Sequence, residues 1–521
     1  MSGLHTVHVR VNDASGKPTP VRIRFFGLDY AYYAPLGRLM RAPTTPGEAV
    51  GGNLCTGLGK ERWDQGEWAY IDGACEIALP PDPVHVEIHK GPEYKPIVQT
   101  VALGPGKMAL RFPIERWADL RAERWYSGDM HAHFLSPHAA LLEGAAEDLA
   151  VVNLLAMDWP LRQPNAPPKI IPNILEFSGQ EARVQQPGHL VVVNTLNNGG
   201  ILGALGLLNS HRAVFPLSIG LEPDGAIDWT LADWCDQCHR KRGLVVWTQF
   251  GRSWAGDSEG GFSGETLADL LLGKIDALEV DRLDGARNRL TDEWYRLLNC
   301  GLNVPVVGGS GKMSNATTLG AVRTYARLTE GEEFTYANWI EAVRAGRTFV
   351  TNGPLLTFTV NGLDPGASIE LPADNRKVVI RAEARSAAPI DRLELVANGA
   401  AVACVEASGA PSSATLEGTF EVPGSGWLAA RCWGSAQVYT RGTADAVAAH
   451  TSPVYVTIPG HPLQVDPISV ALLGERLESM LHWAEHGARF ASDKVRNDLL
   501  GIFNAARAEL ARRLKSPAPE E

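Results

Sequence analysis

Three residues that can bind a metal ion occur together in the segment WYSGDMHAHF. Asp129, His131 and His133 are spaced two residues apart. On a β-strand this spacing turns all three side chains to one face. Two imidazoles placed in this way suit a borderline divalent ion such as zinc, iron or manganese, and the carboxylate can bind the ion or orient a ring. The segment therefore predicts a metal site on a strand.

A carboxylate and a third imidazole follow in the segment FSGQEARVQQPGHLVVVN. Glu181 precedes an apolar strand, and His189 stands where that strand begins. A metal-bridging carboxylate and a further imidazole are what a multinuclear site needs. The alternative interpretation makes Glu181 a surface residue and His189 a turn residue.

The pattern of the chain divides it into four segments that must position these residues. Residues 1–115 alternate apolar and polar positions between turn clusters, which predicts a β-sandwich-like domain. Residues 116–345 alternate apolar strands with helical stretches, as a parallel β/α barrel or wound sheet does, and functional groups of such folds lie at the carboxyl ends of strands. Residues 346–462 predict a second, Ig-like β domain, and residues 463–521 predict helices.

Apolar residues repeat at helical spacing near the carboxyl terminus. They are Val495, Leu499, Ile502, Phe503, Ala506 and Leu510. This face is expected to pack on the barrel, and a homo-oligomer contact is the alternative.

Charge and cysteine content narrow the class of partner. Lys and Arg number 48 against 59 Asp and Glu, a net charge of -11 that disfavours nucleic acid and anionic membranes and favours a small-molecule substrate. The first residues do not form a leader pattern, and no apolar run reaches the length of about 18 residues needed to span a membrane. The seven cysteines are scattered and odd in number, which predicts reduced thiols and a cytoplasmic protein.

One cysteine motif permits other chemistry. Cys235, Cys238 and His239 have the spacing of a c-type haem attachment and of a redox dithiol. The surrounding segment 229–243 has the periodicity of an amphipathic helix, and we favour the structural interpretation.

Several long segments between about residues 120 and 460 carry a resemblance to a known family. They are WYSGDMHAHFLSP, EDLAVVNLLAMDW, GQEARVQQPGHLVVVN, GLVVWTQF, WYRLLNCGLNVPVVGGSGKM, AGRTFVTNGPLL and AHTSPVY. These segments resemble the carbaryl-hydrolase-like (CehA/McbA) branch of the PHP metallohydrolase superfamily. The resemblance implies a distorted β/α barrel flanked by β domains, two or three divalent metal ions, and hydrolysis of an ester, carbamate or phosphoester.

The resemblance also assigns ligands. His131 and His133 match the first motif of the family, Glu181 its metal-bridging glutamate, and His189 the histidine of its Gly-His element. Gln249 stands where the family usually ends a strand with histidine, and is the remaining candidate ligand.

Two positions depart from the family pattern. Gln249 offers a weaker amide ligand, and Gly311 replaces the aspartate of a Gly-Ser/Thr-Asp turn and offers no side chain. We therefore expect fewer metal ions than the family cluster holds. Four groups are the candidates to compensate: His138, Asp158, Asp257 and Glu259.

Three residues are candidates for catalysis beside a metal-activated water. Asp129 would orient a ligand or move a proton, and Lys312 and Arg347 would meet an anionic group or oxyanion. A purely structural role for Arg347, in the turn that enters a strand, is the alternative and the one we favour.

Three functions are compatible with these patterns. The first is a metal-dependent hydrolase with a reduced site. The second is a degenerate barrel that acts as a binding module or in a metal-independent elimination or isomerisation, motivated by Gln249 and Gly311. The third uses the flanking domains to bind glycans, with some of the 14 Trp residues as stacking platforms.

Overall fold

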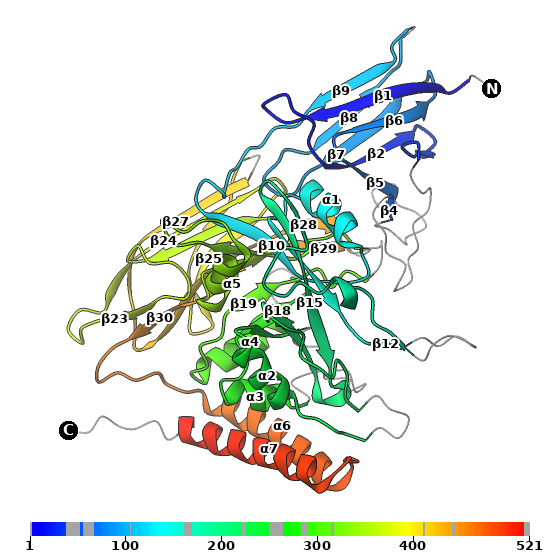
Figure 1. Cartoon of the computed structure of the whole chain (residues 1–521). Helices are drawn as coiled ribbons and strands as arrows, with labels where there is room; N and C mark the ends of the chain where they lie inside the picture. Colours follow the sequence, from blue (N-terminus) through cyan, green and yellow to red (C-terminus); the bar gives the residue numbers. More distant parts are fainter. Residues whose placement is uncertain are drawn as a thin grey trace.

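The computed structural model describes residues 3–37, 53–55, 67–104, 106–160, 169–220, 226–248, 264–283, 289–313, 317–409, 412–439 and 444–514. The N-terminal part forms two β-sheets packed face to face around one apolar core (Figure 1). In the first strand every second residue is buried, as the sequence pattern predicts. One sheet contains β1 (His5–Asn12), β6 (Ala74–Leu79) and β9 (Ala109–Pro113). The other contains β2 (Val21–Gly27), β3 (Tyr32–Tyr33), β4 (Asn53–Cys55), β5 (Glu67–Ile71), β7 (Val84–His89) and β8 (Ile97–Val101).

The central part is a curled sheet of mainly parallel strands. The first three strands of the curl pair in parallel with one another, and so do the last three. The strand between these two groups pairs antiparallel to both of its neighbours. These strands are β10 (Trp125–Ala132), β11 (Val151–Ala156), β15 (His189–Asn198), β16 (Ala204–Leu208), β17 (Leu244–Trp247), β18 (Ala277–Val280) and β19 (Val306–Gly308). A single parallel bridge between Ala132 and Lys312 joins the end of β10 to the loop after β19. The curl therefore brings its first and last strands together at their carboxyl ends.

Helices separate most of these strands. They are α1 (Pro137–Ala146), α2 (Leu231–Arg240), α3 (Thr266–Leu271) and α4 (Arg289–Asn299). Short elements at the periphery are β12 (Trp159–Pro160), β13 (Lys169–Ile170), η2 (Ile174–Glu176), β14 (Val184–Gln186) and η3 (Gly200–Leu202). Helix α5 (Tyr336–Arg344) follows β20 (Arg323–Arg327), and its buried Trp339 packs against the core formed by the sheet. A side chain at Gly128 of β10 would collide with the Trp339 ring at 2.4 Å, so glycine is needed there.

The sheet extends beyond the barrel segment that the sequence predicts. The other edge of β10 pairs with antiparallel β20, β20 pairs with β21 (Thr348–Thr351), and β21 pairs with β29 (Ala444–Thr451). In the part of the chain that the structure describes, sixteen strands thus share one sheet that runs into the C-terminal β region. Buried backbone groups on a strand edge need partners, and strands from residues beyond 345 supply them. The central and C-terminal β regions are therefore joined through their backbones.

The C-terminal β region is a second sandwich. A three-stranded sheet packs on the continuing large sheet around a core of Leu, Ile, Val and Ala side chains. The small sheet contains β22 (Leu355–Val360), β24 (Lys377–Ser386) and β27 (Ser412–Glu421). The large sheet adds β23 (Ser368–Glu370), β25 (Arg392–Ala397), β26 (Ala400–Glu406), β28 (Gly426–Tyr439) and β30 (Val454–Thr457).

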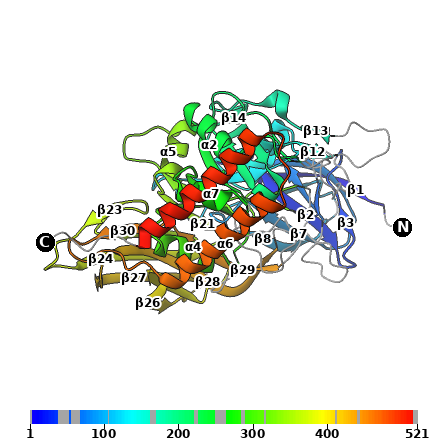
Figure 2. The same cartoon turned by 90° about the horizontal axis from the view of Figure 1, so that it is seen from below.

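Two long helices, α6 (Pro467–His486) and α7 (Asp493–Leu514), lie side by side beneath the central region (Figures 1 and 2). Four residues of the apolar face that the sequence singles out are buried in the core shared with α2, α3 and α4: Leu499, Phe503, Ala506 and Leu510. This face packs within the chain. No helix among the described residues is both long and apolar enough to cross a membrane.

The cysteine motif lies on α2 and faces the same core. Cys235 and Cys238 are fully buried, and burial raises the pKa of Cys238 to about 12. His239 lies outside this pair and bonds to Asp276 through its Nε2 at 2.9 Å. Such thiols stay protonated and inert at neutral pH, which agrees with a structural helix.

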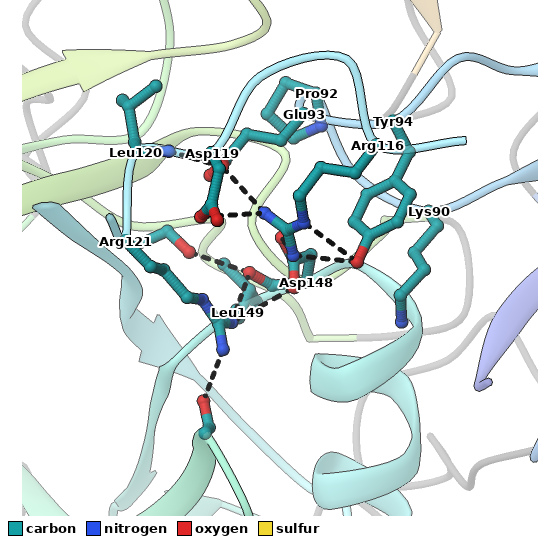
Figure 3. A network of polar contacts seen from close by, with 12 residues as sticks. Lys90, Pro92, Glu93, Tyr94, Arg116, Asp119, Leu120, Arg121, Asp148 and Leu149 are labelled. Carbon is teal, nitrogen blue, oxygen red and sulfur yellow. Dashed lines mark hydrogen bonds and ion pairs between the residues drawn. The ribbon is translucent and has the colours of Figure 1, made fainter. Parts of the chain in front are cut away.

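An ion-pair network fastens the N-terminal sandwich to the central region (Figure 3). Arg116 bonds to Glu93 at 2.8 Å and to Asp148 at 2.9 Å, and Arg121 bonds to Asp148 at 3.1 Å. Glu93 belongs to the sandwich, and Asp148 lies between α1 and β11. The two neighbouring arginines lower the pKa of Asp148, although burial acts in the opposite direction.

The buried carboxyl group of Asp269 on α3 makes the stability of the fold depend on pH. The side chain is fully buried, and neither carboxylate oxygen has a hydrogen-bond partner among the described residues. Burial, reinforced by Glu265, raises its pKa well above the usual 3.8. The unfolded chain loses this proton at lower pH than the folded chain, so stability falls as pH rises from about 4 towards the folded pKa.

Asp269→Asn is expected to flatten this dependence, which amounts to at most about 1.4 kcal/mol per pH unit. Urea unfolding between pH 5 and pH 8 measures it. Asp374→Asn, at an exposed turn, is the matched control. Equal pH slopes for both variants and the wild type would contradict the assignment.

Candidate metal centre

The strand that carries the predicted triplet is almost entirely buried. The pairing of β10 with β11 shifts register between Asp129 and Ala132, and the strand ends there. His131 lies inside this irregular stretch and His133 just beyond it; they are 1% and 2% exposed. Both stand at the carboxyl end of a parallel strand, as expected for functional residues in such sheets.

The two histidine rings converge through the same type of nitrogen. Nε2 of His131 lies 2.7 Å from Nε2 of His133, and the rings are nearly perpendicular at 81°. The outer nitrogen of each ring faces an acceptor. His131 Nδ1 lies 2.9 Å from both carboxylate oxygens of Glu279, and His133 Nδ1 lies 2.7 Å from the carbonyl oxygen of Leu155. Carboxylate and carbonyl oxygens only accept, so both Nδ1 atoms donate and both Nε2 atoms point at one another.

The pKa values of the two rings are shifted in opposite directions. Burial lowers the pKa of His133 to about 3, and His131 adds to this effect. Burial also disfavours the charged form of His131, but the Glu279 carboxylate outweighs it and raises the pKa of His131. His131 therefore donates the Nε2 hydrogen bond and His133 accepts it. A divalent ion competes with this proton, because it binds the same Nε2 lone pairs.

Glu279 is a functional residue that the sequence reasoning did not single out. It lies on β18, is fully buried, and reaches His131 across the curl. Gly309 makes this approach possible, because a Cβ there would stand 2.6 Å from Glu279 Oε1 and 2.8 Å from His131 Cβ. The available signal was a charged residue inside the apolar strand ALEV.

Asp129 holds the backbone around the pair. Its oxygens accept hydrogen bonds from the backbone N–H groups of His131 at 3.0 Å, Ser310 at 2.9 Å and Gly320 at 2.8 Å. Its charge favours the protonated form of His131, yet it makes no hydrogen bond to either imidazole. This geometry gives Asp129 a positioning role.

Backbone groups of Gly311 and Lys312, in the loop after β19, bond to the end of β10. The carbonyl of Lys312 accepts from His133 N–H at 2.8 Å, and Gly311 N–H donates to the carbonyl of His131 at 2.9 Å. The Lys312 ammonium group is fully buried; it donates to the Thr317 carbonyl at 2.7 Å and pairs with Glu143 at 3.5 Å. Lys312 thus reaches towards α1. Gly311 has a φ of +58°, which favours glycine at this turn.

The structure does not bring His189 to the pair. It opens β15, and its Nδ1 bonds to the Leu149 carbonyl at 2.6 Å. Leu155, which binds His133, lies alongside Asn194, five residues further along β15. At about 3.3 Å per residue this separates His189 from the pair by about 16 Å along the strand direction. His189 begins its strand, whereas the candidate ligands stand at carboxyl ends.

Two other candidates also lie elsewhere. Glu181 is exposed in the turn before β14 and makes no ion pair with a described residue. Arg347 precedes β21 and donates from Nε to the Arg327 carbonyl at 3.0 Å, near the start of β10. Gln249 lies outside the described residues, as do Asp257 and Glu259.

Two carboxylates lie near the carboxyl ends of other strands. Asp281 follows β18, and its charge favours protonation of His131. Asp158 follows β11 and accepts a hydrogen bond from the Ser218 hydroxyl at 2.6 Å. His138 is exposed on α1. Within the described ranges, no group of three or more His, Cys, Asp or Glu side chains is arranged to hold a metal ion. The described site is a two-histidine centre with Glu279 behind it.

Comparison with known proteins found no matching family model and no matching curated protein. Among the solved structures that align over part of the chain are the following two. The first is a two-domain protein from Bacteroides vulgatus that contains a predicted PHP-like metal-dependent phosphoesterase; it is 11% identical, covers 64% of this chain and 96% of its own, and has a TM-score of 0.36. The second is PsfC from Pseudomonas syringae, 15% identical, covering 42% of this chain and 88% of its own, with a TM-score of 0.26.

Proposed function

We propose that this chain is a metal-dependent hydrolase whose ion is bound by His131 and His133. The observation that carries the proposal is the convergence of the two Nε2 atoms while each Nδ1 is held by an oxygen acceptor. Histidines that bind metals are oriented in this way, because the second nitrogen donates to a carboxylate or carbonyl that fixes the tautomer. With each Nδ1 held in this way, both Nε2 atoms are directed to the one point where an ion would bind.

The donor set fits a borderline divalent ion such as zinc, manganese or iron. Such an ion supplies Lewis-acid chemistry: it makes water more acidic and polarises a carbonyl or phosphoryl oxygen. The chain itself orients the imidazoles through Glu279 and Leu155, and Asp129 fixes the backbone behind them. The Asp281 carboxylate, which follows β18, adds negative charge near His131.

The finer assignment rests on the resemblance of the sequence to the CehA/McbA branch of PHP hydrolases. It suggests a small-molecule ester, carbamate or phosphoester as substrate. Two family positions are not joined to the pair among the described residues, since His189 bonds to the Leu149 carbonyl and Glu181 is exposed. Two more depart in sequence, because Gly311 has no side chain and Gln249 replaces a histidine. We therefore propose fewer ions than the family cluster.

A panel of chromogenic substrates tests the hydrolase activity. p-Nitrophenyl acetate, p-nitrophenyl phosphate and an aryl N-methylcarbamate represent the three bond classes. We expect turnover of at least one, loss of turnover after chelation, and recovery with added zinc or manganese. Turnover that is unchanged in metal-free protein would contradict the proposal.

Glu279→Gln tests the orientation of the histidine. The amide keeps the shape of Glu279 but removes the charge that holds His131 Nδ1–H. We expect metal affinity to fall about 10- to 100-fold, as for other partners of ligating histidines. Competition with a fluorescent chelator measures this without any activity assay. Glu417→Gln, on an exposed position of β27, is the control. Equal affinities in the two variants would show that Glu279 does not support a metal ligand.

A degenerate barrel is the second candidate function. The arrangement of only two imidazoles, with no third ligand among the described residues, favours it. In that case the chain acts as a binding module or in metal-independent chemistry. Gly311→Asp separates the two candidates. The φ of +58° strains any side chain there, but Asp is among the residues that adopt this conformation, and a Cβ at residue 311 meets only Asp281 Cβ, at 4.0 Å. Metal binding that appears only in this variant would favour the degenerate barrel.

A further inference from the structure

A cavity lies where the three β-rich regions meet. Its volume is about 290 Å³. His89 and Lys90 reach it from the end of β7, Arg323 from the start of β20, and Ala387 from the loop after β24. The cavity is therefore bordered by the N-terminal sandwich, the central sheet and the C-terminal sandwich.

Positive charge dominates this cavity. Its ionised lining residues are the cations Arg22, Lys90 and Arg323 and the carboxylate Glu147. Glu147 is already engaged, because Arg22 Nε lies 2.8 Å from its Oε1. The pKa of His89 is lowered to about 3, by burial first and by two nearby arginines, so its ring is neutral. Lys90 and Arg323 are left without an ion pair among the described residues.

Lys90 is bound only by neutral groups. It is 4% exposed, and Nζ donates to the carbonyl oxygens of Pro20 at 2.8 Å and Ala145 at 2.7 Å. No carboxylate of the described residues lies within ion-pair distance of it. Figure 3 draws it beside Tyr94, next to the network in which Arg116 already binds Glu93 and Asp148.

Arg323 is likewise a buried cation that is bound by neutral groups. It is 5% exposed, its Nε donates to the Gly320 carbonyl at 3.0 Å and its Nη1 to the Glu147 carbonyl at 2.8 Å. It forms no ion pair with a described residue, and its Nη2 is not used in a hydrogen bond there. Burying a cation without an anion costs free energy, and two such cations on one cavity make that cost large.

We propose that this cavity binds a small anion bearing a carboxylate or phosphate group, with Lys90 and Arg323 as its charged ligands. A volume of about 290 Å³ is at the small end of the range for ligand pockets, so it suits a small metabolite. Charge-assisted hydrogen bonds from an ammonium and a guanidinium group are the strong contacts such anions make. The anion stabilises the folded chain, because it joins three regions that all border the cavity.

The site is separate from the histidine pair. Asp129 lies between the two, since Gly320, which borders the cavity, donates its N–H to Asp129. Neither imidazole lines the cavity, so the two sites can be tested separately.

Isothermal titration calorimetry of the full chain tests the proposal with two probes, inorganic phosphate and succinate, at constant ionic strength set with chloride. We expect at least one probe to bind and to raise the melting temperature, and the responding probe identifies the anionic group. Lys90→Met is expected to weaken binding by at least about tenfold, the effect of one charge-assisted hydrogen bond.

Ala387→Trp blocks the cavity from an exposed position without removing a charge, and the same loss is expected. Lys377→Met, an exposed lysine of β24, is the matched control and is expected to bind like the wild type. A protein in which both His131 and His133 are alanine is expected to keep its affinity. The proposal is overturned if neither probe binds, if Ala387→Trp binds as tightly as the wild type, or if the histidine double variant loses binding.

Discussion

His133→Ala is expected to lose its metal and its hydrolytic turnover together. The substitution removes one of two converging Nε2 ligands from a buried site, while its outer hydrogen-bond partner is only the Leu155 carbonyl. Loss of a supporting partner costs about 10- to 100-fold in affinity, so loss of a ligand is expected to exceed about 100-fold. Turnover should fall to the level of the chelated wild type.

Metal content by elemental analysis and affinity by chelator competition measure this effect. His138→Ala is the control, because it removes an exposed imidazole from α1 close in sequence to the site. Circular dichroism verifies that both variants are folded. A folded His133→Ala protein with wild-type metal content would contradict the assignment.

Asp129→Ala is expected to cause the largest loss of stability. It leaves three backbone N–H groups, of His131, Ser310 and Gly320, without their acceptor in a fully buried place. Each unsatisfied group costs about 1–3 kcal/mol, so the loss for the three groups is expected to be at least about 3 kcal/mol. Asp129→Asn should cost less, because an amide oxygen can keep the two bonds made by Oδ1 and loses only the one made by Oδ2.

Urea unfolding gives both losses as changes in the free energy of unfolding. Asp374→Ala, at an exposed turn, should leave that free energy unchanged. The decisive result is the ranking of the losses in free energy of unfolding, which should be largest for Asp129→Ala, smaller for Asp129→Asn and absent for the control. If Asp129→Asn were as stable as the wild type, the carboxylate would not be needed to hold these loops, and a catalytic role would become the better explanation.

Local patterns in the sequence predicted the elements well. Alternation in β1 and helical spacing in α7 both translate into buried faces, because they depend on the geometry of one element alone. His131 and His133 meet by a less regular route, because the pairing of β10 shifts register between Asp129 and Ala132 and β10 ends before His133. The continuation of the sheet from β21 into β29 was not predicted, because it pairs residues about 100 positions apart in the sequence.

Long-range position also explains what the sequence reasoning missed at the site. Glu279 is 148 residues from His131 in the chain, and only the curl of the sheet brings them together. His189 illustrates the converse, since closeness to an apolar strand does not reveal which end of that strand carries the function. A charged residue inside the buried strand ALEV was the useful signal, because burial of a lone carboxylate demands a partner.

Anomalous diffraction from crystals soaked with zinc or manganese tests the central claim most directly. The account predicts an anomalous peak between the two imidazoles, within about 2.0–2.3 Å of both Nε2 atoms, with Glu279 still bound to His131 Nδ1. A direct Nε2–Nε2 hydrogen bond that persists in the soaked crystals, with no anomalous peak at the pair, would contradict it.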